Sequence, residues 1–418
     1  MLVMRDRPRA AKALIGVRLI NQLGAYVMSF LAVLAGPRLA AAALAVFGLA
    51  ALVSRWIGGL LLDRFAPRTL IVLGLASTGA ALLLLAAARG DGQFLAAVAL
   101  VGLAFEIYEP ATQESLARVG GRRSDLYGLL GTLAVAVGAI GGLLAAVLLP
   151  LGPRWLAVVD GLTCLLAAGV AVLFLARDPP VRRAARSVRW RPPRRLLRLT
   201  AAGTAFGCGY LAVLMFMPLV LLQRGAPPWL PGLTLTGAAV LAPLTGYLGR
   251  RRLNACRHEH VLAIGCAVLG VLAAVLAAGR PVPLTVAAYL AWAAADSVLQ
   301  GRWQALIADI APEPDRPRWF AFFGSSWGVA QPAVPGLVAL TGAAMPVGAV
   351  AFLLTSVLLH RPGRRRSIGP GAAGTGAAGT GAAGTGAAGT GAAGTGAART
   401  DVAGAARGHG TGDGVRSP

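Results

Sequence analysis

Charged residues are scarce in this sequence. Asp, Glu, Lys and Arg make up 13% of the 418 residues, about half of their share in a typical soluble domain. Acidic residues are fewer than basic residues, with 16 Asp and Glu against 39 Lys and Arg, while 56% of the chain is hydrophobic. This composition excludes an ordinary soluble globular domain and predicts apolar runs long enough to span a bilayer.

Lysine is almost absent, since Lys12 is the only one. The formal net charge of +23 therefore comes from arginine, and the arginines lie between apolar runs rather than on one soluble face. This distribution argues against nucleic-acid binding. The near absence of lysine beside abundant Ala and Gly is typical of GC-rich coding in a bacterium.

Cysteine is also rare, and the four cysteines show no spacing of a disulfide framework or a CxxC site. The stretch from Cys256 to His260 has zinc-ligand residue types, but no second cluster is present to complete a tetrahedron. HExxH motifs, nucleophile elbows and phosphate-cradling loops are absent from the sequence. We therefore predict no metal, no cofactor and no enzymatic activity, and the missing P-loop argues against an ATP-driven pump.

Apolar runs recur in two sets of six, separated by an arginine-rich stretch. Each run is long enough to cross a bilayer, and only helices satisfy the backbone in lipid. We expect an all-α integral membrane protein with twelve transmembrane helices. The runs cover 13–35, 38–62, 69–88, 93–116, 127–149, 155–176, 199–222, 230–249, 260–279, 283–308, 319–341 and 343–360.

The arginines alternate between the connections, and this alternation gives the orientation. Every second connection is rich in arginine, and the connections between them carry one at most. The positive-inside rule then places both termini and the central loop in the cytoplasm, in a bacterial inner membrane. We divide the chain into a six-helix bundle (1–176), a basic linker (177–198), a second bundle (199–360) and a disordered cytoplasmic tail with GAAGT repeats (361–418).

The connection after the second run contains a motif. Its residues run Gly58-Gly59-Leu60-Leu61-Leu62-Asp63-Arg64-Phe65-Ala66-Pro67-Arg68, which resembles the signature loop of the major facilitator superfamily (MFS), G-x-x-x-D-R-x-G-R-R. Four residues keep the pattern: Gly59, Asp63, Arg64 and Arg68. The resemblance implies a conformational latch at the membrane surface and a fold of two pseudo-symmetric six-helix bundles.

The two halves also resemble each other, as they do in that superfamily. Gln113 can be aligned with Gln304, and Leu116-Ala117 with Ile307-Ala308. Within the superfamily, the chain is similar to twelve-helix drug or metabolite:proton antiporters. The resemblance implies a monomer in the lipid bilayer that exchanges a small molecule for protons.

Two carboxylates lie deep within predicted spans. Glu106 in span four and Asp296 in span ten are both about 20 Å from the outer end of their helix. In the superfamily, spans one, four, seven and ten line the central cavity, so both are candidates for a proton or cationic-substrate site. A static ion pair that locks helices together is the alternative.

Other polar groups in the spans are further candidates for the proton or substrate site. Glu109 lies nearer the cytoplasm, where it either serves the site or pairs with Arg18 or Arg55. The remaining candidates either face the cavity or pack between helices; they are Asn21, Gln22, Tyr26 and Arg302, with Trp292 and Trp303 as possible lining residues. Asp160 is expected to be structural.

The sequence therefore predicts a secondary transporter that exports a small amphipathic molecule, such as a drug or secondary metabolite, by proton-coupled alternating access. Two alternatives stay open at this point: proton-coupled uptake by symport, and a membrane scaffold that keeps the fold but does not transport.

Overall fold

The computed structural model describes residues 9–24, 27–61, 64–109, 111–112, 115, 123–175, 191–253, 256–279, 281–312 and 315–360. All regular secondary structure in these residues is helical, which confirms the predicted all-α fold class. The elements are α1 (Arg9–Gly24), α2 (Val27–Leu61), α3 (Pro67–Ala87), α4 (Asp91–Phe105), α6 (Arg123–Leu148), the 3-10 turn η2 (Leu149–Leu151), α7 (Arg154–Phe174), α8 (Arg194–Gln223), α9 (Leu230–Leu253), α10 (His258–Ala277), α11 (Val282–Leu299), α12 (Arg302–Ile310), α13 (Arg316–Thr341) and α14 (Ala344–His360).

Seven helical segments of the described residues are long and apolar enough to cross a membrane. They are Ser29–Gly58, Pro67–Ala87, Arg154–Phe174, Arg194–Gln223, Leu230–Leu253, His258–Ala277 and Val282–Ile310. Shorter apolar helices occupy Asp91–Phe105, Ala136–Leu151 and Ala344–His360. Each of the twelve predicted runs overlaps a helix, and the count of twelve spans stays a prediction.

A glycine separates the first two predicted spans, which share α2. Gly36 has φ +70° and ψ 167°, a conformation that other residues reach only with strain, and Pro37 follows it. The first span therefore consists of α1 and the start of α2, and the second consists of the rest of α2. α8 begins at Arg194, so helix extends into the range 177–198 assigned to the linker. The tail from 361 lies outside the described residues.

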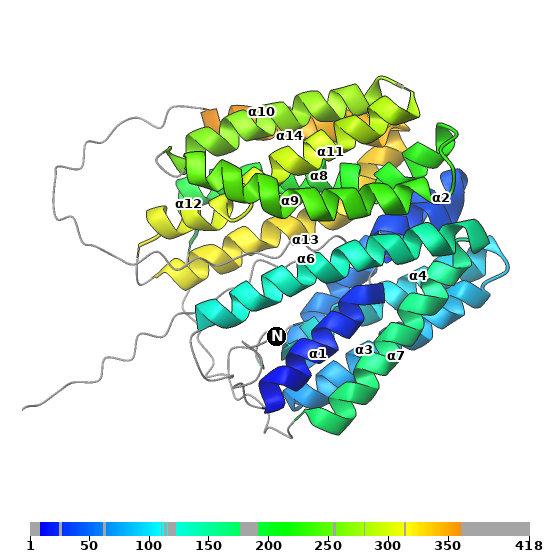
Figure 1. The fold of residues 1–418 in the computed structure, drawn as a ribbon. Helices are drawn as coiled ribbons and strands as arrows, with labels where there is room; N and C mark the ends of the chain where they lie inside the picture. The colour runs from blue at the N-terminus through cyan, green and yellow to red at the C-terminus, as the bar shows by residue number, and fades with distance from the viewer. Residues whose placement is uncertain are drawn as a thin grey trace, which may run out of the picture.

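The helices form two groups that lie side by side (Figure 1). In the first group, α3 packs on α7 and α4, and α1 packs on α7. In the second, α14 packs on α10 and α8, and α11 packs on α9 and α10. The groups meet where α2 contacts α8 and α13, and where α6 contacts α9.

Two glycines make the crossing of α6 and α9 very close. A Cβ on Gly142 would meet the Thr236 side chain and lie 2.8 Å from the Gly232 carbonyl oxygen, and a Cβ on Gly232 would collide with the backbone of Ala146. The Thr236 hydroxyl donates a hydrogen bond to the Ala139 carbonyl at 3.1 Å. The two backbones therefore touch without side chains between them, as small residues allow in membrane helices.

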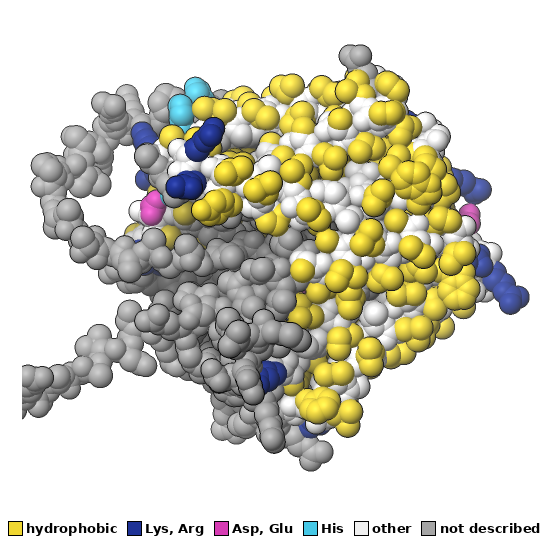
Figure 2. Space-filling model, viewed as in Figure 1, with side chains coloured by type: hydrophobic (Ala, Val, Ile, Leu, Met, Phe, Trp, Pro, Cys, Tyr) yellow, Lys and Arg dark blue, Asp and Glu magenta, His cyan; other side chains and the backbone are white. Residues whose placement is uncertain are grey.

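The outer surface is apolar between the two ends of the molecule. Figure 2 shows hydrophobic side chains over the middle of the visible face, with charged groups gathered at the ends of the helices. Large apolar residues are exposed along the helices, including Leu340 at 86%, Leu173 at 75% and Trp56 at 75%. This is the surface of a multi-pass membrane protein, whose flanks face hydrocarbon.

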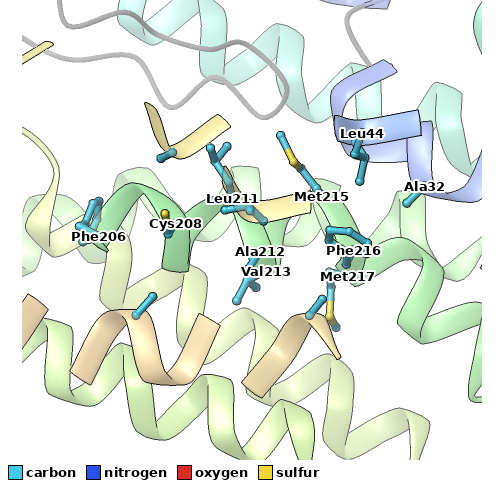
Figure 3. Close-up of a cluster of buried hydrophobic side chains, with 14 of the residues drawn as sticks. Ala32, Leu44, Phe206, Cys208, Leu211, Ala212, Val213, Met215, Phe216 and Met217 are labelled. Atoms are coloured by element: carbon cyan, nitrogen blue, oxygen red, sulfur yellow. The ribbon is translucent and has the colours of Figure 1, made fainter. Parts of the chain in front are cut away.

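The most completely buried helix is α8. Its middle carries apolar side chains on all sides, and in Figure 3 Met215 lies on the side of Leu44 and Ala32, both on α2. Met215, Ala212 and Val213 are fully buried. A helix that is apolar all round is stable only where other helices surround it, and α8 accordingly lies in the core that both groups share.

Candidate functional site

The helices run between two ends of the molecule, and the polar residues predicted inside the spans lie between these ends. We call the end where α7 finishes and α8 begins the linker end, and the opposite end the far end. Both α4 and α11 begin at the far end. The structure breaks both of these spans before they reach the linker end.

Glu106 lies at the first break. α4 ends at Phe105, and Glu106 is its C-cap. The Glu106 backbone N–H donates to the Ser54 hydroxyl on α2 at 3.2 Å, and the residue is only 2% exposed. A turn follows before helix resumes at Tyr108, so a buried carboxyl group marks the point where the span is interrupted.

Asp296 lies just before the second break. It is 6% exposed on α11, and the Gln300 amide donates to its carboxylate at 2.9 Å. α11 ends at Leu299, and α12 starts after Gly301, which has φ +79°. A glycine is favoured there because other residues are strained in this left-handed region.

The two acids lie at matching depth in their spans. At a rise of about 1.5 Å per residue, Glu106 is about 22 Å and Asp296 about 21 Å from the far end of its helix. The sequence predicted this depth. The structure adds that each carboxyl is buried beside a break in its span.

Glu109 and Arg18 form an ion pair between the first and fourth spans. The Arg18 guanidinium lies 3.2 Å from the Glu109 carboxylate, and three N···O contacts link the two groups. The alternative in which Glu109 pairs with Arg18 is therefore the one observed. The Arg55 side chain lies outside the described part of the chain.

A prediction tests the strength of this pair. Glu109→Gln should lower the melting temperature in detergent more than the double variant Arg18→Gln/Glu109→Gln does, because the single change leaves an arginine without its counter-charge. Thermal melts of wild type, both singles and the double give the coupling. Additive effects would show that the pair contributes nothing to stability.

Asn21 takes part in hydrogen bonds between helices. Its amide N–H donates to the Tyr108 hydroxyl at 2.9 Å, and its carbonyl accepts from the Cys164 thiol at 3.3 Å. The same thiol lies 3.7 Å from the Asp160 carboxylate. Gln22 is half-buried on α1, and Tyr26 lies outside the described residues.

Arg302 binds the ends of two helices. Its guanidinium donates to the carbonyls of Val298, near the end of α11, and of Leu253, the last residue of α9, at 3.3 and 3.2 Å. His258 is 3.5 Å away. The carbonyls of a last helical turn have no partner within their helix and carry partial negative charge, so a cation stabilises them. Arg302 is only 4% exposed and connects the ends of α9 and α11 beside the break. We call this contact the joint.

The joint gives a second prediction. Arg302→Met should lower the free energy of unfolding by about 2–4 kcal/mol, because two buried carbonyls lose a charged donor. The measurement is a thermal or denaturant melt of the purified protein. Arg154→Met, at an exposed arginine at the far end, is the matched control. An unchanged melting curve for Arg302→Met would show that Arg302 does not stabilise the ends of α9 and α11.

The signature loop is described in part. Gly59 lies within α2, Asp63 lies outside the described residues, and Arg64 is exposed. Arg68 donates to the carbonyls of Ala171 and Val172 at the end of α7, so that it caps that helix. Within the described residues, the loop therefore joins α3 to α7 in the first group.

An aromatic cluster includes Trp292, which lies one helical turn before Asp296 on α11, and the sequence indicated only two of its members. Tyr210 of α8 contacts Trp292 of α11 and Trp327 of α13, with ring centroids 5.6 and 5.5 Å apart. Tyr289 stacks on Trp292 at 5.7 Å. The other rings were missed because the apolar middles of α8 and α13 carry no charged residue that would mark a site. Only the fold shows that these rings lie together.

The arrangement suits a carboxyl that changes its charge. A carboxylate in apolar and aromatic surroundings is costly unless it binds a proton or a cation. Among the described residues, no three His, Cys, Asp or Glu side chains lie close enough together to hold a metal. Glu259, in the stretch with zinc-ligand residue types, pairs with Arg195 at 3.1 Å.

Comparisons with known proteins agree with the fold. The sequence model of the Major Facilitator Superfamily matches residues 14–335. No curated protein sequence matches the chain. An auto-inhibited POT family peptide transporter superposes with a TM-score of 0.71 at 15% identity, covering 86% of this chain and 98% of its own.

Two further solved structures are similar. A bacterial homologue of the iron transporter ferroportin, in an inward-facing state, has a TM-score of 0.64 at 16% identity, covering 84% of this chain and 98% of its own. The nucleoside transporter NupG has a TM-score of 0.67 at 11% identity, covering 83% of this chain and 98% of its own. At these identities the likeness shows the fold alone.

Proposed function

The chain belongs to the Major Facilitator Superfamily and is a secondary transporter, and from this premise we propose that it exports a small amphipathic molecule in exchange for protons. The exchange proceeds by alternating access, in which the two helix groups rock about a central site. We place both termini on the cytoplasmic side, because arginine alternates along the connections. We further propose a bacterial cytoplasmic membrane, from the GC-rich composition, and a monomer, from the resemblance to the superfamily.

The observation that carries this proposal is the burial of Glu106 and Asp296 beside breaks in two corresponding spans. Ionisable groups are expensive inside a membrane and are retained where they serve transport. A break frees backbone groups and lets a span bend near the carboxyl. Protonation and bending can therefore occur at the same place.

The proposed cycle uses one acid as the exchange site. Asp296 loses its proton toward the cytoplasm and then binds substrate from that side. After the transporter opens outward, a proton from the higher external concentration displaces the substrate. Glu106 is proposed as a second proton site, while the Arg18–Glu109 pair and Asn21 hold spans one and four together.

The experiment uses vesicles that contain the purified full-length protein and a trapped pH-sensitive dye. Protons should cross the vesicle membrane only after a transported compound is added, and a protonophore should abolish the coupling between the two fluxes. A panel of amphipathic compounds is tested, since the substrate is not identified. Asp91→Asn, which removes an acid that is paired with Arg38 at the far end, is the control variant.

The outcomes separate the alternatives. Substrate and protons moving in opposite directions support export by antiport, and movement in the same direction would identify uptake by symport. A folded, reconstituted protein that moves neither protons nor any tested compound would contradict the proposal and favour a scaffold.

A further inference from the structure

A groove runs between α10 and α14 on the outer side of the second group. Its volume is about 470 Å³, and its walls on α10 are apolar: Ala263, Ile264, Ala267, Val268, Val271 and Leu272. Ile264 and Val271 are more than half exposed, so the groove opens outward. Two alanines among these residues leave space that larger side chains would fill. The groove therefore faces the hydrocarbon of the membrane and is apart from the buried acids.

The groove has the length of an acyl chain in one leaflet. From Ala263 to Leu272 it follows α10 for about 14 Å, and half of the hydrocarbon core of a bilayer is about 15 Å thick. Its first residue lies about 8 Å from His258, where α10 begins at the linker end. The groove therefore lies in the leaflet of the linker end.

The linker end of the groove is polar. Ser356 and His360, in the last turns of α14, complete its lining, and the rings of His360 and His260 of α10 lie 6.2 Å apart. Both histidines are exposed, and Figure 2 shows histidine side chains at the margin of the apolar surface. Each imidazole has an N–H donor whatever its charge, and a serine hydroxyl can also donate.

Basic residues outnumber acids around this polar end. Glu259 pairs with Arg195 at 3.1 Å and with Arg257 at 3.7 Å, so that two cations face one carboxylate. Four further arginines follow α14 in the sequence, within 361–366. Such surroundings attract an anion. An anion at the end of an apolar groove of this length matches the head group of an anionic phospholipid.

We propose that the groove binds one anionic phospholipid from the leaflet of the linker end. One acyl chain lies along α10, and the phosphate accepts hydrogen bonds from His260, His360 and Ser356. The bound lipid connects α10 with α14 at the outer edge of the second group. The inference is independent of the proposed transport cycle, because the groove is on the outside of the molecule.

Native mass spectrometry of the delipidated full-length protein in detergent tests the inference. The probe is dioleoyl phosphatidylglycerol, and dioleoyl phosphatidylcholine, with the same chains and no net charge, is its control. One phosphatidylglycerol should bind per protein, about tenfold more tightly than phosphatidylcholine. The double variant His260→Gln/His360→Gln should lose this preference. His409→Gln, at a histidine of the tail, should keep it.

Filling the groove tests the place of the acyl chain. Ala267→Phe should weaken the binding of phosphatidylglycerol about tenfold or more, because the chain loses its apolar contacts. Ala274→Phe, at an exposed alanine of α10 outside the groove, is the matched control and should bind as the wild type does. A melting temperature close to that of the wild type shows that each variant is folded. If Ala267→Phe does not fold, the exposed histidines decide the result.

Three results would overturn the inference. The first is equal binding of the two lipids, and the second is a double histidine variant that keeps the preference for phosphatidylglycerol. The third is a folded Ala267→Phe protein with wild-type affinity. Inorganic phosphate is also tested in thermal melts. Stabilisation by phosphate equal to that by phosphatidylglycerol would identify an anion site that needs no acyl chain, and would overturn the inference as well.

Discussion

Asp296→Asn is expected to reduce proton-coupled flux to the level of vesicles without protein. The amide has nearly the shape of the acid and can still accept the Gln300 hydrogen bond, so the fold should persist. It can neither release a proton nor attract a cation, and the exchange step is lost. Flux driven by a pH gradient is the measurement, and a melting temperature within a few degrees of wild type shows that the variant is folded.

The Asp296→Asn experiment has a matched control variant and a result that would contradict the prediction. Asp91→Asn removes an acid of the far end and should keep the wild-type flux. Glu106→Gln then shows whether the acid of the first group shares the coupling. An Asp296→Asn protein with wild-type flux from pH 5.5 to 8 would mean that Asp296 does not exchange protons, and the proposed cycle would be wrong.

Gly142→Leu is expected to prevent correct assembly of the two helix groups. Its Cβ alone would meet the Thr236 side chain and the Gly232 carbonyl, and these neighbours are partly backbone, which cannot rotate away. Overpacking by a few atoms usually costs about 1–3 kcal/mol. A leucine in place of Gly142 would add four side-chain carbon atoms at this crossing. We expect little folded protein, and no flux from whatever is recovered.

Gly169→Leu is the matched control, because a Cβ on Gly169 of α7 would meet nothing within 4 Å. Both variants make the same change inside a helix, so their difference isolates the crossing. Yield of monodisperse protein and melting temperature are compared side by side. If Gly142→Leu behaves like Gly169→Leu, the close approach of α6 and α9 is not needed for the fold.

The fold class could be predicted from the sequence because hydrocarbon imposes a simple rule. Segments that span a membrane must be helical, apolar and about 20 residues long. Each span predicted from this rule overlaps a helix of the structure. Gly142 packs closely on α9 as a small residue. Its contact with Gly232 was not predicted, because one glycine among 56 gives no signal until the facing helix is known.

Candidate site residues were predicted mainly where a charged or polar residue interrupted an apolar run. Glu106 and Asp296 were noticeable for that reason, and so was Glu109. The breaks beside Glu106 and Asp296 were not predicted, since Gly301 and Glu106 follow sequences with ordinary helical patterns. The aromatic cluster and the partners of Arg302 depend on contacts between α8, α9, α11 and α13, which no local pattern encodes.

The position of Arg302 limits how the tenth span can move. One guanidinium holds carbonyls from the ends of α9 and α11, and separating these ends would strip both carbonyls of their donor. The ends of α9 and α11 are therefore tied together through the first residue of α12, and a bend at Gly301 would have to break the hydrogen bond from Arg302 to Val298. Bending of the tenth span thus carries an energetic cost set by a single side chain, which Arg302→Met would remove.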